Sequence, residues 1–264
     1  MLAQLPPFTL FTWGSATLLA LILLCRMLAL RLYRVYPLFA AYLTCNLIQA
    51  AVAVCLYQWL GFSSKLAFRI GWSTQAVVVV IRALAAAEVC RHVLGKFKGV
   101  WAMSSRLMLT CGILVLCCAL YFGRDGYQFM VTKLEIGLES FIATCVVGLF
   151  CFARYYDVQV SRPAGLLGLG LGLNSCVKIL NDLVFQKFVK SYLAEWNYVA
   201  SSAFIVVLGI WIWGLWKQQV AVPVSGPGLS TSSVYQSLMP QVNRRLLELN
   251  EQLGQLWKTE PRRP

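Results

Sequence analysis

A small set of polar residues lies inside long apolar stretches of this sequence, and these side chains are best placed to carry chemistry. They are Arg82, Glu135, Glu139, Asn174, Lys178 and Asp182. An ionised group surrounded by hydrocarbon is costly unless it is paired or hydrated, so such groups mark binding sites, relays or structural ion pairs. Glu135 and Glu139 are four residues apart, as are Lys178 and Asp182, so each pair shares one face of a helix. The spacing therefore predicts two polar helix faces that can meet.

Counting residues along the helices brings several of these charges to one depth. At about 1.5 Å per residue, Glu135 lies roughly 8 Å from the boundary where its helix begins. The next helix runs the opposite way, which places Lys178 at about the same level in a hydrocarbon core roughly 30 Å thick. Arg82, from a third helix, is within reach of Glu139. We therefore expect a polar cluster in the outer half of the membrane, which either binds or relays a solute or consists of structural ion pairs.

The sequence lacks the motifs of common enzymes and cofactor sites. His92 is the only histidine, which argues against His-ligated haem, HExxH zinc sites, di-iron sites and a Ser–His pair. The cysteines lie mostly inside apolar stretches without a CxxC, as packing residues do. Glu135 and Glu139 form a conceivable acid/base pair, but no substrate-orienting motif lies beside them. We expect no catalytic residue, cofactor or metal, although an enzymatic role stays open.

The elements that must position these charges are membrane-spanning helices. Of the 264 residues, 59% are hydrophobic and 12% are charged, about half the charged fraction of an ordinary soluble domain. The apolar runs are about as long as the roughly 20 residues that a helix needs to cross a bilayer. They cover Phe8–Leu30, Pro37–Leu60, Leu66–Val93, Ser104–Phe122, Met130–Phe152, Pro163–Phe188 and Asn197–Trp216. The expected fold is an all-α bundle of seven transmembrane helices.

The distribution of Lys and Arg predicts the orientation of the bundle. The first, third and fifth connections and the C-terminal tail carry most of these residues, whereas the N-terminal arm carries none. Cytoplasmic loops are enriched in Lys and Arg, so the N-terminus is expected outside and the C-terminus in the cytoplasm. The net charge of +13 is spread over helix ends and does not form one patch, which argues against nucleic acid as a partner. We expect a multi-pass protein of the inner (plasma) membrane, with the lipid bilayer as its main partner.

Small residues at the start of the sixth segment predict close helix packing. Gly168 and Gly172 form a GxxxG pattern, and Gly165 extends the same small face. Such a face lets a neighbouring backbone approach closely in a membrane. The neighbour is either another helix of the same bundle or the same helix in a second copy.

We expect residues 1–217 to form the bundle, and the chain after it to divide into three parts. These are a flexible linker at 218–239, a short amphipathic helix at 240–258 and a disordered end at 259–264. The apolar residues of the tail helix recur at helical spacing, and they are Val242, Leu246, Leu249, Leu253 and Leu256. This seam lies on the membrane surface or against the bundle, or it joins a cytoplasmic partner or a second copy.

Our first functional hypothesis is a sensor- or receptor-like membrane module. It binds a small solute or a lipid in the outer-half cluster, and its tail helix reports the change to a partner. One alternative is a small-solute transporter, although neither internal repeats nor broken helices are visible. The others are an intramembrane enzyme that modifies lipid and a structural or assembly protein.

Overall fold

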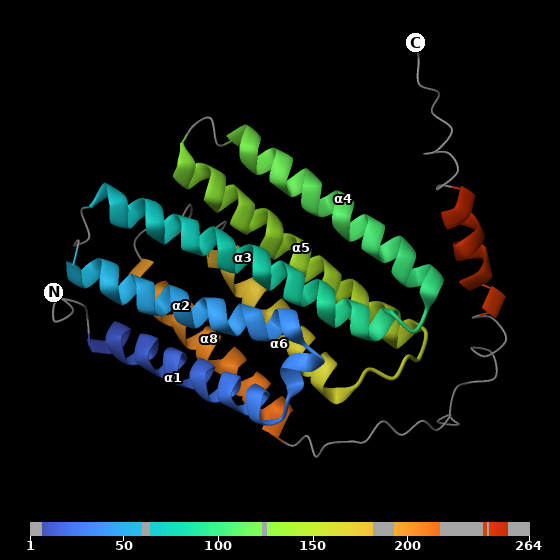
Figure 1. Cartoon of the computed structure of the whole chain (residues 1–264), viewed down its shortest axis with the longest axis horizontal. Coiled ribbons are helices and arrows are strands. Elements are labelled where there is room, and N and C mark those ends of the chain that lie inside the picture. Colours follow the sequence, from blue (N-terminus) through green and yellow to red (C-terminus); the bar gives the residue numbers. More distant parts are fainter. Residues whose placement is uncertain are drawn as a thin grey trace, which may run out of the picture.

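The computed structural model describes residues 7–59, 64–122, 126–181, 193–216 and 240–252 apart from 242, and these ranges form helices without strands (Figure 1). The elements are α1 (Pro7–Ala29), the short 3-10 helix η2 (Leu32–Arg34), α2 (Pro37–Trp59), α3 (Lys65–Leu94), α4 (Lys98–Phe122), α5 (Tyr127–Tyr155), α6 (Arg162–Ile179) and α8 (Leu193–Trp216). A further short helix lies within 240–252. The expected all-helical fold is confirmed. The helix ends differ from the expected segments by a few residues, most at α4, which begins at Lys98. The last part of the expected segment Pro163–Phe188 lies outside the described residues.

Among the described residues, five helical stretches are long and apolar enough to cross a bilayer. They are Phe8–Ala29, Pro37–Leu56, Lys98–Tyr121, Tyr127–Tyr155 and Tyr198–Trp216. The chain is therefore a multi-pass helical membrane protein. α3 and α6 are not among the five. α3 carries buried charges at Arg82 and Glu88, and the 18 residues of α6 include Arg162, Asn174 and Lys178, which lower its mean hydropathy.

Six of the long helices form a closed ring, and α4 lies outside it. Around the ring α1 contacts α2, α2 contacts α3, α3 contacts α5, α5 contacts α6, α6 contacts α8, and α8 returns to α1. α4 packs mainly on α5, at the edge of the bundle in Figure 1. α3 also contacts α6 across the ring. A site enclosed by this ring therefore receives side chains from six helices but none from α4.

A carboxylate from α3 caps the N-terminus of α2. The first amides of a helix have no partner within the helix, and Pro37 opens α2. Glu88 accepts hydrogen bonds from the backbone N–H of Leu38 at 3.1 Å and of Phe39 at 3.0 Å. Negative charge at a helix N-terminus is also favoured by the helix dipole. The buried Glu88 is thus a structural residue that orients α2 against α3.

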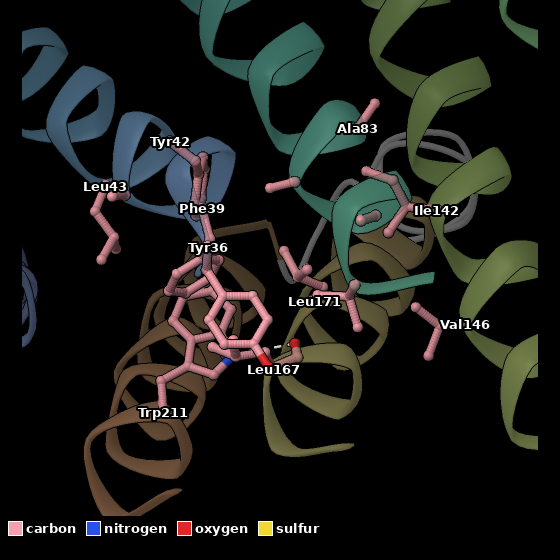
Figure 2. Packing of buried hydrophobic residues seen from close by; sticks show 14 of the residues in the cluster. Tyr36, Phe39, Tyr42, Leu43, Ala83, Ile142, Val146, Leu167, Leu171 and Trp211 are labelled. Atoms are coloured by element: carbon pink, nitrogen blue, oxygen red, sulfur yellow. Dashed lines mark hydrogen bonds between the residues drawn. The ribbon is translucent and has the colours of Figure 1, made fainter. Parts of the chain in front are cut away.

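Trp211 packs against α6 beside Leu167 and thereby joins α6 and α8 (Figure 2). Trp211 of α8 is fully buried, donates from Nε1 to the Leu167 carbonyl at 3.3 Å, and meets Phe39 edge to face at 5.0 Å. A Cβ at Gly170 would lie 2.2 Å from Trp211 Nε1, a separation that real Cβ atoms essentially never show. Only glycine therefore leaves room for the Trp211 indole at this position of α6.

Candidate functional site

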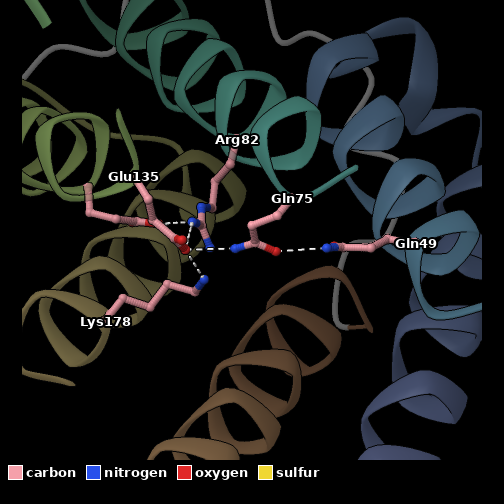
Figure 3. A network of polar contacts seen from close by, with 6 residues as sticks. Gln49, Gln75, Arg82, Glu135 and Lys178 are labelled. Atoms are coloured by element: carbon pink, nitrogen blue, oxygen red, sulfur yellow. Dashed lines mark hydrogen bonds and ion pairs between the residues drawn. The ribbon is translucent and has the colours of Figure 1, made fainter. Parts of the chain in front are cut away.

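The carboxylate of Glu135 is the meeting point of a polar network at the centre of the ring (Figure 3). Its Oε1 accepts from Gln75 Nε2 at 2.7 Å and from Lys178 Nζ at 2.6 Å. Arg82 Nη2 lies 3.9 Å from the same oxygen. Gln49 Nε2 extends the network by donating to Gln75 Oε1 at 2.7 Å. α2, α3, α5 and α6 therefore all contribute to one hydrogen-bonded chain.

A second ion pair lies behind this network, between Arg82 and Glu139. Their side chains are 3% and 0% exposed, so both charges are removed from solvent. The Tyr42 hydroxyl also interacts with the Arg82 guanidinium. Two buried opposite charges compensate each other, whereas one alone would be strongly destabilising. The pair Arg82–Glu139 therefore holds α3 against α5 and keeps the guanidinium beside Glu135.

A chamber of about 560 Å³ lies next to the network and is lined from six helices. Its polar lining consists of Thr9, Thr12, Thr17, Tyr42, Asn46, Gln49, Gln75, Arg82, Glu135, Asn174, Lys178, Asn181 and Ser201. Trp13 and Phe204 add aromatic surface. The chamber is a half-open cleft, and it is far larger than the water-sized gaps that packed protein interiors normally leave. Its volume falls within the range usual for small-molecule sites.

One buried amide of the chamber has no hydrogen-bond partner among the described residues. Asn174 lines the chamber and is 4% exposed, yet its Nδ2 is unpaired. A buried amide without a partner costs about 1–3 kcal/mol, so native proteins nearly always satisfy it. The chamber therefore presents a donor that a bound acceptor would complete.

Some of the residues expected from the sequence line the chamber and others do not. Arg82, Glu135, Asn174 and Lys178 line the chamber, and Glu139 lies behind Arg82. Asp182 lies outside the described residues. Gln75 was not among the expected residues, although it is seven residues before Arg82 and so two turns away on the same helix face. The sequence signal that could have predicted Gln75 is an uncharged polar residue two helical turns from a buried charge.

A second cavity, of about 470 Å³, adjoins the chamber between α2 and α3. It shares Gln49, Gln75 and Glu135 with the chamber. Its remaining lining consists of Val52, Ala53, Leu56, Ala67, Phe68, Gly71, Trp72 and Thr74. The hydrogen bond between Gln49 and Gln75 thus lies at the boundary of the two cavities.

The expected glycine face of α6 lies within the bundle. A Cβ at Gly172 would lie 2.9 Å from the Val146 side chain of α5, and one at Gly168 would lie 3.5 Å from Val89 of α3. A Cβ at Gly165 would meet only Val160, at 3.6 Å. The closest approach on α6 is at Gly170, which lies on a different face from the GxxxG pattern.

The tail helix contacts the start of α4 through a mixed face. Asn243 Oδ1 accepts from the backbone N–H of Gly99 at 2.9 Å, and Arg106 Nη1 donates to the Asn250 carbonyl at 3.3 Å. A Cβ at Gly99 would lie 3.1 Å from the Cβ of Leu246. Of the expected apolar seam, Leu246 faces α4 and Leu249 is 54% exposed. The other members, Val242, Leu253 and Leu256, lie outside the described residues.

The residue types at the site do not by themselves indicate one class of function. Among the described residues, no group of three or more His, Cys, Asp and Glu side chains is placed to hold a metal ion. No protein family, no curated protein and no solved structure matches this chain. The functional argument therefore rests on the geometry of the chamber.

Proposed function

We propose that this chain is a receptor-like membrane module that binds a small polar or amphiphilic solute, or a lipid, in the chamber. The observation that carries the proposal is the volume of about 560 Å³ beside the Glu135 network. If the charges served only as structural pairs, side chains would be expected to fill the space around them. The unpaired Asn174 amide and the partly exposed Lys178 offer contacts to a ligand.

The proposal includes seven membrane crossings with the N-terminus outside and the C-terminus in the cytoplasm of an inner (plasma) membrane. α3 and α6 lie in the ring between apolar helices, and burial of their polar groups there compensates for their lower hydropathy. The distribution of Lys and Arg over the connections supports the orientation. Under this topology the chamber reaches the outer face of the membrane, because it includes Thr9 near the start of α1 and Asn181 just beyond the end of α6.

A physical route from the chamber to the tail passes through α5 and α4. Gly137 lies on α5 between Glu135 and Glu139, and a Cβ at Gly137 would lie 2.6 Å from Val115 of α4. A shift of α5 on ligand binding therefore pushes on α4 at a close contact. The start of α4 contacts the tail helix through the hydrogen bond from Gly99 to Asn243. We propose that this contact changes when the chamber is occupied, which would report binding to a cytoplasmic partner or a second copy.

The experiment that tests binding is a thermal-stability screen of the purified protein in nanodiscs against metabolites and lipids. A ligand at a hundredfold excess over its Kd adds about 2.7 kcal/mol to stability. Lys178→Met removes a chamber cation and should abolish the increase. Lys133→Met is the matched control, because Lys133 lies on the exposed side of α5 and does not line the chamber. If no compound raises the midpoint of the wild type, the charges are structural pairs and the receptor proposal is wrong.

A small-solute transporter is the second candidate, and the paired cavities favour it. The chamber and the second cavity are divided at the Gln49–Gln75 hydrogen bond, a contact that can open and close. Transport predicts flux of the identified ligand into proteoliposomes, whereas a receptor binds without flux. Accumulation that disappears in Lys178→Met and persists in Lys133→Met would favour the transporter.

A further inference from the structure

The two cavities share three residues of their lining. Gln49, Gln75 and Glu135 line both the chamber of about 560 Å³ and the second cavity of about 470 Å³. The two glutamines are joined by one hydrogen bond of 2.7 Å between their side-chain amides. The helix backbones of α2 and α3 need not separate for this contact to open. A single ligand can therefore extend through both cavities after two side-chain rotations.

The second cavity is apolar beyond the shared wall. Its own lining is aliphatic or aromatic or lacks a side chain, with Thr74 as the exception. Thr74 Oγ1 already donates to the Gly71 carbonyl at 2.9 Å, so its proton is not offered to a ligand. Phe68, also in the lining, is 45% exposed on the surface of the bundle. This cavity suits a hydrocarbon chain that comes from the surrounding lipid.

The chamber suits an uncharged headgroup. Arg82 is compensated by Glu139 and Lys178 by Glu135, so these four charges sum to zero. A charged ligand would add an uncompensated charge beside the buried Arg82 and Glu139, which is unfavourable. The contacts of Glu135 in the described part of the chain all use Oε1, and Asn174 Nδ2 has no acceptor. Hydroxyl groups can donate a hydrogen bond to the Glu135 carboxylate and accept one from the Asn174 amide.

We propose that the ligand is a single-chain amphiphile with an uncharged, hydroxyl-bearing headgroup. The headgroup occupies the chamber, the chain occupies the second cavity, and the ligand passes between Gln49 and Gln75. This inference rests on the proposed binding function, since it names the class of ligand that the chamber takes. It requires no change in the number of charges buried, because the ligand replaces one hydrogen bond with others.

Photocrosslinking locates the chain. The probe is a dodecanoyl glycerol with a diazirine at the end of its chain, irradiated with the protein in nanodiscs and mapped by mass spectrometry. We expect saturable labelling of the cavity wall at Val52, Leu56, Phe68 and Trp72, which excess unlabelled dodecanoyl glycerol suppresses. Labelling that is unsaturable and spread over the outer surface of α4 would overturn the inference.

Two glycine variants sharpen the test. Gly71→Leu projects a side chain into the second cavity, where a Cβ would meet nothing within 4 Å, and should reduce the saturable labelling at least about tenfold. Gly148→Leu is the matched control: its Cβ also meets nothing within 4 Å, but it lies on an exposed face of α5 and lines neither cavity. Equal labelling of both variants would count against the assignment of the cavity.

A soluble short-chain analogue separates this inference from the proposed function. Butanoyl glycerol, which carries the headgroup but little chain, should raise the thermal midpoint of the wild type and of Gly71→Leu alike. It should leave the thermal midpoint of Lys178→Met unchanged. Stabilisation by this compound together with unsaturable labelling by the long-chain probe would overturn the amphiphile and retain the chamber. No stabilisation by either compound would overturn the amphiphile, and the wider ligand screen would then decide the proposed function.

Discussion

Glu135 acquires its role from contacts with three other helices. Its Oε1 accepts hydrogen bonds from Gln75 and Lys178 and lies near Arg82, so one carboxylate joins α3, α5 and α6. Glu139, one turn later, is fully buried and compensates only Arg82. Two glutamates on one helix face therefore have different functions: Glu135 meets the chamber, and Glu139 maintains the charge balance behind it.

The first prediction concerns this division between the two glutamates. Glu139→Gln leaves the buried Arg82 without its compensating charge, and we expect the free energy of unfolding to fall by about 3–5 kcal/mol. The double variant Arg82→Met, Glu139→Leu removes both charges and should recover most of that loss. Denaturant or thermal unfolding in a fixed detergent measures both. A loss below about 1 kcal/mol in the single variant would mean that Glu135 alone compensates Arg82.

At the scale of the element, α6 is fitted to its neighbours by glycines on two faces. Gly172 and Gly168 face α5 and α3, and Gly170 receives Trp211 of α8. Without large side chains, α6 approaches each neighbour closely, and close packing is what drives helix association in lipid. This approach brings Asn174 and Lys178, further along α6, to the chamber.

The second prediction tests that fit. Gly170→Ala places a Cβ 2.2 Å from Trp211 Nε1 and 2.7 Å from its Cε2, and we expect a destabilisation of about 1–3 kcal/mol from overpacking. Gly168→Ala is the matched control on the same helix, because its Cβ would meet Val89 at an ordinary 3.5 Å. It should be neutral or stabilising by up to about 1 kcal/mol through helix propensity. Unfolding in detergent compares the two, and equal effects would contradict the packing argument.

The third prediction concerns the tail helix. Asn243→Ala removes the oxygen that accepts the Gly99 amide at the start of α4, a capping contact worth about 0.5–2 kcal/mol. We expect faster hydrogen exchange at Gly99 and in the tail helix, with no change in the thermal midpoint of the bundle. Arg244→Ala is the control, since it affects only an exposed ion pair with Glu248. Unchanged exchange in Asn243→Ala would show that the apolar contact at Leu246 alone holds the tail.

At the scale of the whole molecule, the ring of six helices explains where the chamber lies. α1, α2, α3, α5, α6 and α8 enclose it, whereas α4 joins the ring to the tail without lining the chamber. In the receptor that we propose, this arrangement separates the ligand site from the surface that reports binding. Among the described helices, α4 links the ring to the tail helix through its contacts with α5 and α3.

The fourth prediction tests the proposed crossings at α3 and α6. In a variant without the ten native cysteines, single cysteines at exposed positions bracket each helix: Gln58 and Lys96 for α3, and Gln159 and Tyr198 for α6. We expect a membrane-impermeant maleimide to label the cysteines at 58 and 198 on intact cells, and those at 96 and 159 only after lysis. Labelling of both members of a pair from one side would remove that crossing, and the reverse pattern would invert the orientation.

The sequence by itself determined the helical class and the membrane setting. Its apolar runs are long, so hydrogen bonding within each helix is the only way to satisfy their backbone in lipid. Depth counting also brought Lys178 to the level of Glu135, and the two side chains lie 2.6 Å apart. Rise per residue is a property of the helix alone, so depth can be counted without knowing the neighbours.

Only the tertiary structure decided which faces and which helices meet. The sequence did not indicate that Gln75 joins Glu135, that Gly170 receives Trp211, or that α4 lies outside the ring. A helix that is apolar all round has no periodic signal that orients it, and lipid competes equally for every apolar face. Rotation and neighbour choice then depend on the fit of all side chains together. That joint fit creates the chamber, and no single segment of the sequence contains it.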